Sequence, residues 1–173
     1  MLLEETITLY HQVYQFPIVM KEADQGPHDV MNSDCLFCRL VQGDLPSHKV
    51  YEDHDFVVLL TIHPVNPGHA MVVPKRHIES FYDIEDALYT PMMLLVKRMA
   101  RAIKDVFAPL QVVMETSGVG NRHAHVHVLP VYGLYDLAPQ EFVERQEAHA
   151  PSNRELAAVA QNLSVYLASH SLT

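Results

Sequence analysis

The chain has 173 residues, with 21 acidic against 12 lysine and arginine side chains and a formal net charge of −9. An acidic surplus of this size disfavours contact with a long phosphate backbone, so DNA and RNA are poor candidate partners. A small phosphorylated ligand stays open, because backbone amides and a few histidines can hold a single phosphate.

The N-terminal part predicts neither a membrane span nor a secretory signal. No stretch approaches the roughly 18 apolar residues of a transmembrane helix, and Glu4 and Glu5 stand where a signal peptide would carry positive charge. We therefore expect a cytoplasmic protein without membrane contact. The polar run "KEADQGPHDVMNSD" predicts an N-terminal extension over 1–32. The regular pattern loosens beyond Pro130, so we expect a folded domain over 33–135 and a C-terminal segment with a terminal helix over 136–173.

The only two cysteines, Cys35 and Cys38, form one C-x-x-C. With no third cysteine a disulfide framework is excluded, and in an intracellular chain this spacing favours metal binding or redox chemistry. A pair of ordinary buried thiols is the remaining alternative.

Three β-rich runs follow. "KVYED" (49–53) and "FVVLL" (56–60) are separated by a polar turn signal, which predicts a hairpin. "HAMVVP" (69–74) follows the turn-forming stretch "HPVNPG". Two further strands are predicted over 110–116 and 122–130, on either side of a glycine-containing turn.

Two helices are predicted. Thr90 and Pro91 are typical of an N-cap and a first helical position, and the apolar residues after them recur at helical spacing for about 16 residues. Ser152 and Glu155 form a capping box for a last helix that ends near Ala168. Strands joined by short turns, with one long helix, predict an α+β domain: a mostly antiparallel five-stranded sheet with the helix packed on it.

The run "RHAHVHVLP" places three histidines at alternate positions of a predicted strand. Successive side chains of a strand point to opposite faces, so His123, His125 and His127 share one face and the apolar residues between them share the other. One face then packs, and the other binds or does chemistry. Three histidines on a polar face without any role remain the alternative.

Two blocks of the sequence resemble the histidine triad (HIT) family, in order and over about 100 residues. They are "CLFCRLVQGDLPSHKVYEDHDFVVLLTIHPVNPGHAMVVPKRHIESFYDI" and "RHAHVHVLP". The resemblance implies a nucleotide substrate and a homodimer joined through the long helix and a strand. Met92, Leu95 and Met99 could serve that contact, although a helix packed on its own sheet explains the same stripe.

The resemblance also implies roles for the histidines. His125 corresponds to the nucleophile, which would attack the α-phosphorus and carry the nucleotide covalently until water releases it. Imidazole suits this role when its other nitrogen donates to a carbonyl. His127 and the remote His69 correspond to the phosphate-side and orienting histidines.

Bacterial-type members of the family hold a structural zinc, and the resemblance implies the ligands Cys35, Cys38, His77 and His123 here. With four protein ligands the site would be closed, and no position would remain for a catalytic water.

The resemblance further implies a nucleotide pocket, from which this chain departs in two places. Thr61 replaces an acidic ribose ligand, which weakens sugar binding or changes the sugar. The loop before the triad is shorter by about four residues, where Gly120 and Asn121 stand in for the usual phosphate contacts and Arg122 is a candidate phosphate ligand. The apolar residues that match the base pocket are Leu36, Phe37, Leu40, Leu59, Ile62 and Met71.

The leading prediction is therefore a hydrolase of nucleoside phosphoramidates or dinucleoside polyphosphates. His127 stands where nucleotidyltransferase branches carry glutamine, which favours hydrolysis over transfer. Two alternatives stay open: a non-catalytic nucleotide-binding module, and a metallohydrolase in which histidines hold a catalytic zinc.

Overall fold

The structure is a computed structural model that describes residues 34–116, 120–133, 136 and 150–170. The predicted extension over 1–32 and most of the glycine-containing turn lie outside these residues. In chain order the elements are α2 (Leu36–Gln42), β1 (Lys49–Glu52), β2 (Phe56–Leu60), β3 (Ala70–Pro74), η1 (Phe81–Asp83), α3 (Asp86–Phe107), β4 (Gln111–Glu115), β5 (Val126–Val131) and α5 (Asn153–Ser169).

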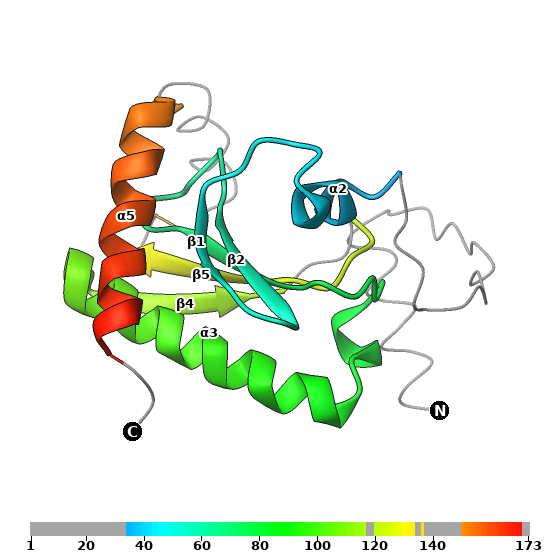
Figure 1. Ribbon diagram of the computed structural model, residues 1–173. Coiled ribbons are helices and arrows are strands. Elements are labelled where there is room, and N and C mark those ends of the chain that lie inside the picture. The colour runs from blue at the N-terminus through cyan, green and yellow to red at the C-terminus, as the bar shows by residue number, and fades with distance from the viewer. Residues whose placement is uncertain (1–33, 117–119, 134–135, 137–149, 171–173) are drawn as a thin grey trace, which may run out of the picture.

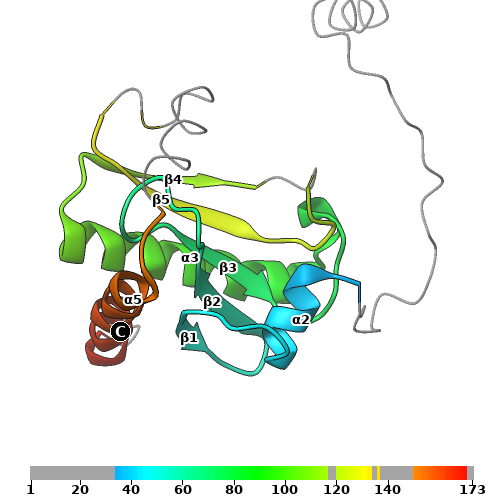
Figure 2. The same ribbon diagram turned by 90° about the horizontal axis from the view of Figure 1, so that it is seen from above.

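The five strands form one antiparallel sheet in the order β1-β2-β3-β5-β4 (Figures 1 and 2). The predicted α+β architecture is thereby confirmed. Strands β1 and β4 are the two edges, and β5, which begins within the histidine run and carries His127, lies between β3 and β4. His127 therefore lies inside the sheet rather than at its margin.

Strand β5 begins at Val126, later than the predicted start at residue 122. The preceding residues bond to other partners: the Ala124 N–H donates to the Ile78 carbonyl at 2.6 Å, and the His123 N–H donates to the Asn121 carbonyl at 2.9 Å. Side chains nevertheless alternate as expected, because the apolar residues that follow each of the three histidines belong to the main core. Those residues are Ala124, Val126 and Val128.

Helix α3 starts at Asp86, five residues before the predicted start, so the assignment of Thr90 and Pro91 to its N-terminus is wrong. The carbonyl of Glu85 accepts from the N–H groups of two residues in the first turn and closes it. Pro91 falls inside the helix, where it removes one backbone hydrogen bond. Burial of one face of the helix offsets that loss.

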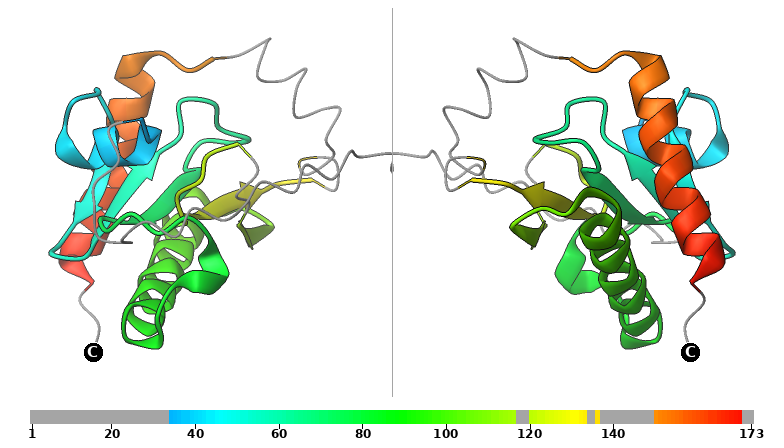
Figure 3. Two further views of the ribbon diagram at one scale, coloured as in Figure 1. Left: turned by 90° about the vertical axis from the view of Figure 1, so that its right-hand side faces the viewer. Right: turned by 90° about the vertical axis from the view of Figure 1, so that its left-hand side faces the viewer.

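The main core lies between the sheet and the two long helices. Figure 3 shows α3 below the sheet, with α5 (orange to red) beside it. Met92, Leu95 and Met99 are buried in this core, so the predicted stripe packs on its own sheet and is not available to a second copy. Helix α5 has the predicted capping box and buries one face in the same core. Its buried residues are Leu156, Ala160, Leu163 and Leu167.

Helix α2 covers the opposite face of the sheet. Phe37 packs there against strand residues in a smaller apolar cluster, whose other buried members are Val57, Leu59 and Val73. Gly43 ends the helix in a left-handed conformation with φ 86°, which suits glycine. This short helix sets the C-x-x-C beside the segment that precedes β5. None of the described helices combines the length and apolar character that a membrane crossing requires.

Candidate active site and metal centre

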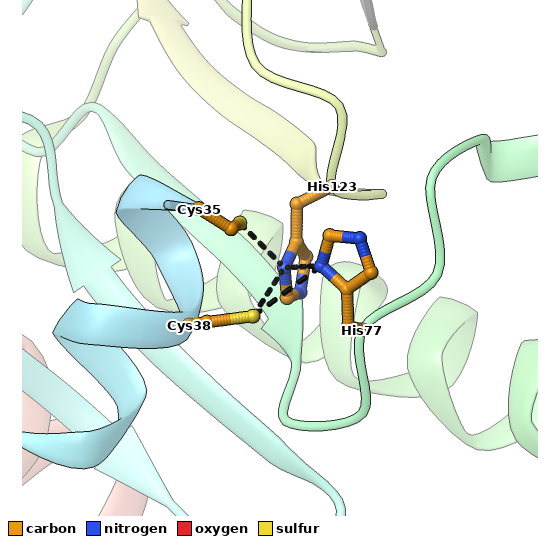
Figure 4. Close-up of side chains that lie close together, drawn as sticks. All are labelled: Cys35, Cys38, His77 and His123. Carbon is orange, nitrogen blue, oxygen red and sulfur yellow. Dashed lines mark hydrogen bonds between the residues drawn. The ribbon is translucent and has the colours of Figure 1, made fainter. Parts of the chain in front are cut away.

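Four side chains from three separate segments converge beside α2 (Figure 4). Cys35 and Cys38 come from the start of α2, His77 follows β3 and His123 precedes β5. Their ligand atoms all lie within 4.8 Å of one another. The Cys35 Sγ lies 3.4 Å from the His123 Nδ1, the Cys38 Sγ lies 3.3 Å from the His77 Nδ1, and the two Nδ1 atoms are 3.3 Å apart.

These spacings fit a tetrahedral zinc ion. At ordinary Zn–S and Zn–N bond lengths, tetrahedral ligands are separated by about 3.5 Å for a sulfur and a nitrogen, and by about 3.3 Å for two nitrogens. The Nε2 of His123 lies 2.9 Å from the Pro74 carbonyl and donates to it, which leaves Nδ1 without a proton and directed at the thiols. The predicted ligand set is therefore brought together in a form that could hold zinc.

His125 comes two residues after His123, a member of this cluster, and the backbone of His123 orients its ring. Its Nδ1 lies 2.6 Å from the backbone carbonyl of His123 and donates to it, so the Nε2 of the neutral ring carries a free lone pair. Burial lowers the pKa of His125, and the hydrogen bond to the backbone opposes that shift. The ring stands 4.5 Å from that of Phe37, and 5 % of the residue is exposed.

His69 and His127 form a directed hydrogen-bonded pair. The Val65 N–H donates to His69 Nδ1 at 3.2 Å, so the proton of the neutral ring sits on Nε2. That Nε2 donates to His127 Nδ1 at 2.9 Å, which in turn places the His127 proton on its own Nε2. His69 thus fixes His127 in the tautomer whose Nε2 can donate a hydrogen bond. Burial lowers the pKa of His69 to about 3 and that of His127 to about 4.

The strand register extends a row of side chains across this face of the sheet. Leu59 pairs with Met71, Met71 pairs with His127, and His127 pairs with Glu115 at the edge strand β4. Residues that oppose each other in an antiparallel pair share a face. The rings of His125 and His127, 4.9 Å apart, lie on this same face, as the alternation predicts. The row thus runs from apolar residues through the triad to a carboxylate.

The predicted base-pocket residues divide into two groups. Phe37 and Leu59 are buried, with Leu40 and Met71 half-buried against them, so these four belong to one apolar cluster between α2 and the sheet. Leu36 and Ile62 are 43 % and 59 % exposed and do not belong to that cluster.

Thr61 follows β2 directly and lines a cavity that the sequence did not predict. Its hydroxyl accepts from the His63 N–H at 3.2 Å. The cavity measures about 520 Å³ and is mostly apolar; the β2–β3 loop, with His69, forms one wall, and the N-terminal part of α5 forms the other. The second wall exists only because α5 packs beside the β2–β3 loop, and no short sequence motif predicts a contact between segments so far apart in the chain.

The three residues just before the triad lie at the surface. Gly120 and Asn121 are exposed, and the Asn121 carbonyl accepts from the His123 N–H. Arg122, considered as a phosphate contact, instead pairs with Glu79 at 3.0 Å, with 55 % of its side chain exposed. Its guanidinium is therefore engaged by a carboxylate in this structure.

Comparison with known proteins matches residues 42–134 to the HIT domain family. A Bacillus subtilis protein named "Protein hit" is 40 % identical over 108 residues, which cover 60 % of this chain and 74 % of that protein. An adenosine 5′-monophosphoramidase of Saccharomyces cerevisiae is 33 % identical over 101 residues, 58 % of this chain and 64 % of the enzyme. A zinc-bound histidine triad protein of Mycobacterium smegmatis superposes with a TM-score of 0.58 at 28 % identity, over 78 % of this chain and 98 % of that structure. This chain belongs to the HIT domain family.

Proposed function

We propose that this protein hydrolyses nucleotides through a covalent nucleotidyl-histidine on His125. The observation that carries the proposal is the hydrogen bond from His125 Nδ1 to the His123 carbonyl, which leaves Nε2 as a lone-pair nucleophile beside His127. Nε2 would form a bond to the α-phosphorus while the bond to the leaving group breaks and that group departs with the electron pair. Water would then cleave the phosphorus–nitrogen bond and restore the imidazole.

The other two histidines would support the same step. His127, which carries its proton on Nε2, is suited to donate to a phosphate oxygen or to the leaving group. His69 keeps His127 in the tautomer that is protonated on Nε2, and His69 itself does not contact the phosphate in this scheme. The apolar surface of Phe37, Leu40, Leu59 and Met71, together with the exposed Leu36 and Ile62, would receive the base, and Thr61 would bond the ribose.

The substrate is a nucleoside phosphoramidate or a dinucleoside polyphosphate. The yeast relative named as an adenosine 5′-monophosphoramidase supports this class. Gly120 and Asn121 lie close enough in sequence to the triad to contact the phosphate from the preceding turn. Cytoplasmic location stays a prediction.

Zinc is proposed as a structural ion held by Cys35, Cys38, His77 and His123. When bound, it would cross-link α2 to the two histidine-bearing segments without presenting an open coordination position. This arrangement argues against a metallohydrolase, because all four ligands come from the protein and His125 is not among them.

A nucleotide-binding module without turnover is the second candidate. It is favoured by the small exposure of His125, 5 %, which leaves little of the ring open to an incoming phosphate. The two functions differ in whether the nucleotide becomes attached to the protein.

Covalent trapping distinguishes them. The protein is mixed with an adenosine phosphoramidate that is hydrolysed slowly, quenched within seconds and analysed by peptide mass spectrometry. The hydrolase predicts an adenylyl group on His125, absent from the H125N variant and retained in an H54N control at an exposed histidine. Full binding of nucleotide without any adduct or product supports the module instead.

We also propose a homodimer, formed through the edge strand β4 rather than the buried stripe of α3. Met114 is 60 % exposed on β4, and Leu94 is 47 % exposed on α3. Sedimentation velocity of the wild type should give twice the monomer mass. M114D should give a mass closer to that of the monomer, because it places a charge in the proposed interface. A monomer at micromolar concentration contradicts the proposal.

A further inference from the structure

Glu115 occupies the last position of the row that crosses the triad face. It lies directly opposite His127 on the neighbouring strand, so the two side chains point to the same face with Cβ atoms about 5 Å apart. Its neighbour Met114 opposes Val128, a residue of the main core, which confirms that Met114 and Glu115 face opposite sides of the sheet. The carboxylate therefore belongs to the same surface as the catalytic histidines.

The row also gives this surface a direction. Leu59 and Met71, part of the proposed base surface, lie on one side of His127, and Glu115 lies on the other. At the α-phosphorus, the nucleoside and the leaving group are bonded to different oxygen or nitrogen atoms and extend apart. With the nucleoside over β2 and β3, the leaving group extends past His127 toward β4. Because β4 is an edge strand, no further strand of the described residues of this chain lies beyond it.

The charge at this end is not neutralised by its described surroundings. Glu115 is exposed, and among residues 34–116, 120–133, 136 and 150–170 its carboxylate has no hydrogen-bond or ion-pair partner. Arg122, the cation nearest the triad in the sequence, is paired with Glu79. A leaving group that reaches β4 would meet a negative charge.

We infer that Glu115 determines specificity by the charge of the leaving group, favouring cationic or neutral amines and disfavouring polyphosphates. The inference rests on the proposed function and narrows it. A phosphoramidate whose amine carries a second, protonated amino group would be attracted by the carboxylate. The phosphates of a dinucleoside polyphosphate would be repelled, because the negative phosphates and the negative carboxylate of Glu115 repel each other even when both are near solvent.

The experiment compares kcat/KM for three adenylyl substrates: a phosphoramidate of a diamine, a phosphoramidate of an uncharged alkylamine, and diadenosine tetraphosphate. E115Q removes the charge with little change of shape. E115Q should reduce the preference for the diamine substrate over diadenosine tetraphosphate by about 5- to 20-fold, and should leave the alkylamine substrate within about 2-fold. The effect should shrink at 1 M salt, because the groups are exposed.

The matched control is E52Q, which changes the net charge equally at β1, the opposite edge of the sheet. It should leave the preference unchanged. If wild type and E115Q hydrolyse all three substrates with the same ratios, the role of Glu115 is wrong although the hydrolase proposal stands.

Equilibrium binding tests the same charge without turnover. ADP carries its second phosphate on the leaving-group side, so E115Q should strengthen ADP binding by about 5-fold and AMP binding by less than about 2-fold. An equal change for both nucleotides contradicts the inference. Absence of turnover on all substrates, with this binding difference present, refutes the hydrolase and keeps the charge selection.

Discussion

The Nδ1 of His125 donates to the backbone carbonyl of His123, a residue whose own side chain belongs to the Cys₂His₂ cluster. One residue therefore contributes a ring nitrogen to the cluster and a carbonyl to the neighbouring imidazole. The hydroxyl of Thr116 donates to the carbonyl of His125 at 2.9 Å and fixes the next peptide unit. The position of the His125 ring thus depends on the Cys₂His₂ cluster, because the cluster holds His123 and the His123 carbonyl holds His125.

Replacement of His125 tests the nucleophile. H125N should reduce hydrolysis by on the order of 10³-fold or more, because the amide cannot form the covalent intermediate. Nucleotide affinity should stay within about 3-fold, since the base surface and His127 are untouched. Steady-state kinetics and calorimetric titration measure the two quantities. Near-parental turnover in the variant would show that another residue attacks.

Metal content tests the cluster. Protein purified without added zinc should contain about one zinc ion per chain, and brief treatment with EDTA should leave activity intact because a closed structural site exchanges slowly. C38S should lose most of the zinc and lower the free energy of unfolding by at least about 2 kcal/mol. Elemental analysis below about 0.3 zinc per chain, with two reactive thiols, contradicts the site. Activity that disappears with EDTA and returns with zinc supports the metallohydrolase instead.

The His69–His127 pair predicts a loss of stability in mild acid. Burial lowers the pKa of His69 to about 3 and that of His127 to about 4, below the ordinary 6.5. Below pH 6.5 the unfolded chain binds protons that the folded chain does not, so stability falls as the pH drops from 6.5 toward 4. Each histidine contributes at most about 1.4 kcal/mol per pH unit.

Urea unfolding between pH 7 and 5 measures this slope. The free energy of unfolding should fall less steeply with decreasing pH in H69Q than in wild type. The cysteine–histidine cluster is the same in both proteins, so its contribution drops out when the two slopes are subtracted. H54Q, at an exposed position, should keep the wild-type slope. Parallel curves for wild type and H69Q would mean that burial does not control the protonation of His69.

Helix α5 should be an integral part of the domain although it lies outside the region matched to the family. Leu163 is fully buried in the main core, so L163A should lower the free energy of unfolding by about 2 to 5 kcal/mol. V165A, at a residue 56 % exposed on the same helix, should change it by less than about 0.5 kcal/mol. Chemical denaturation of both variants compares the two sites. Equal, small losses would indicate that α5 does not hold its place on the core.

The regular parts of the fold could be read from local patterns. β-rich runs bounded by turn signals predicted four of the five strands, alternation predicted the histidine-bearing fifth, and Ser152 with Glu155 predicted the start of α5. The start of α3 was missed because Thr90 and Pro91 match a helix N-terminus locally, whereas tertiary burial extends the helix through them. The start of β5 was missed because the partner of Ala124 is Ile78, and a partner distant in sequence leaves no local signal.

By itself the sequence determined the alternation that places His123, His125 and His127 on one face, and the C-x-x-C spacing that supplies two thiols. These are properties of periodicity and residue type, which do not depend on distant segments. Only the tertiary structure decided which groups meet: His123 with the thiols, His69 with His127, Arg122 with Glu79, and Glu115 opposite His127. Strand register and helix packing fix such contacts, because each depends on the burial of apolar surface over the whole sheet.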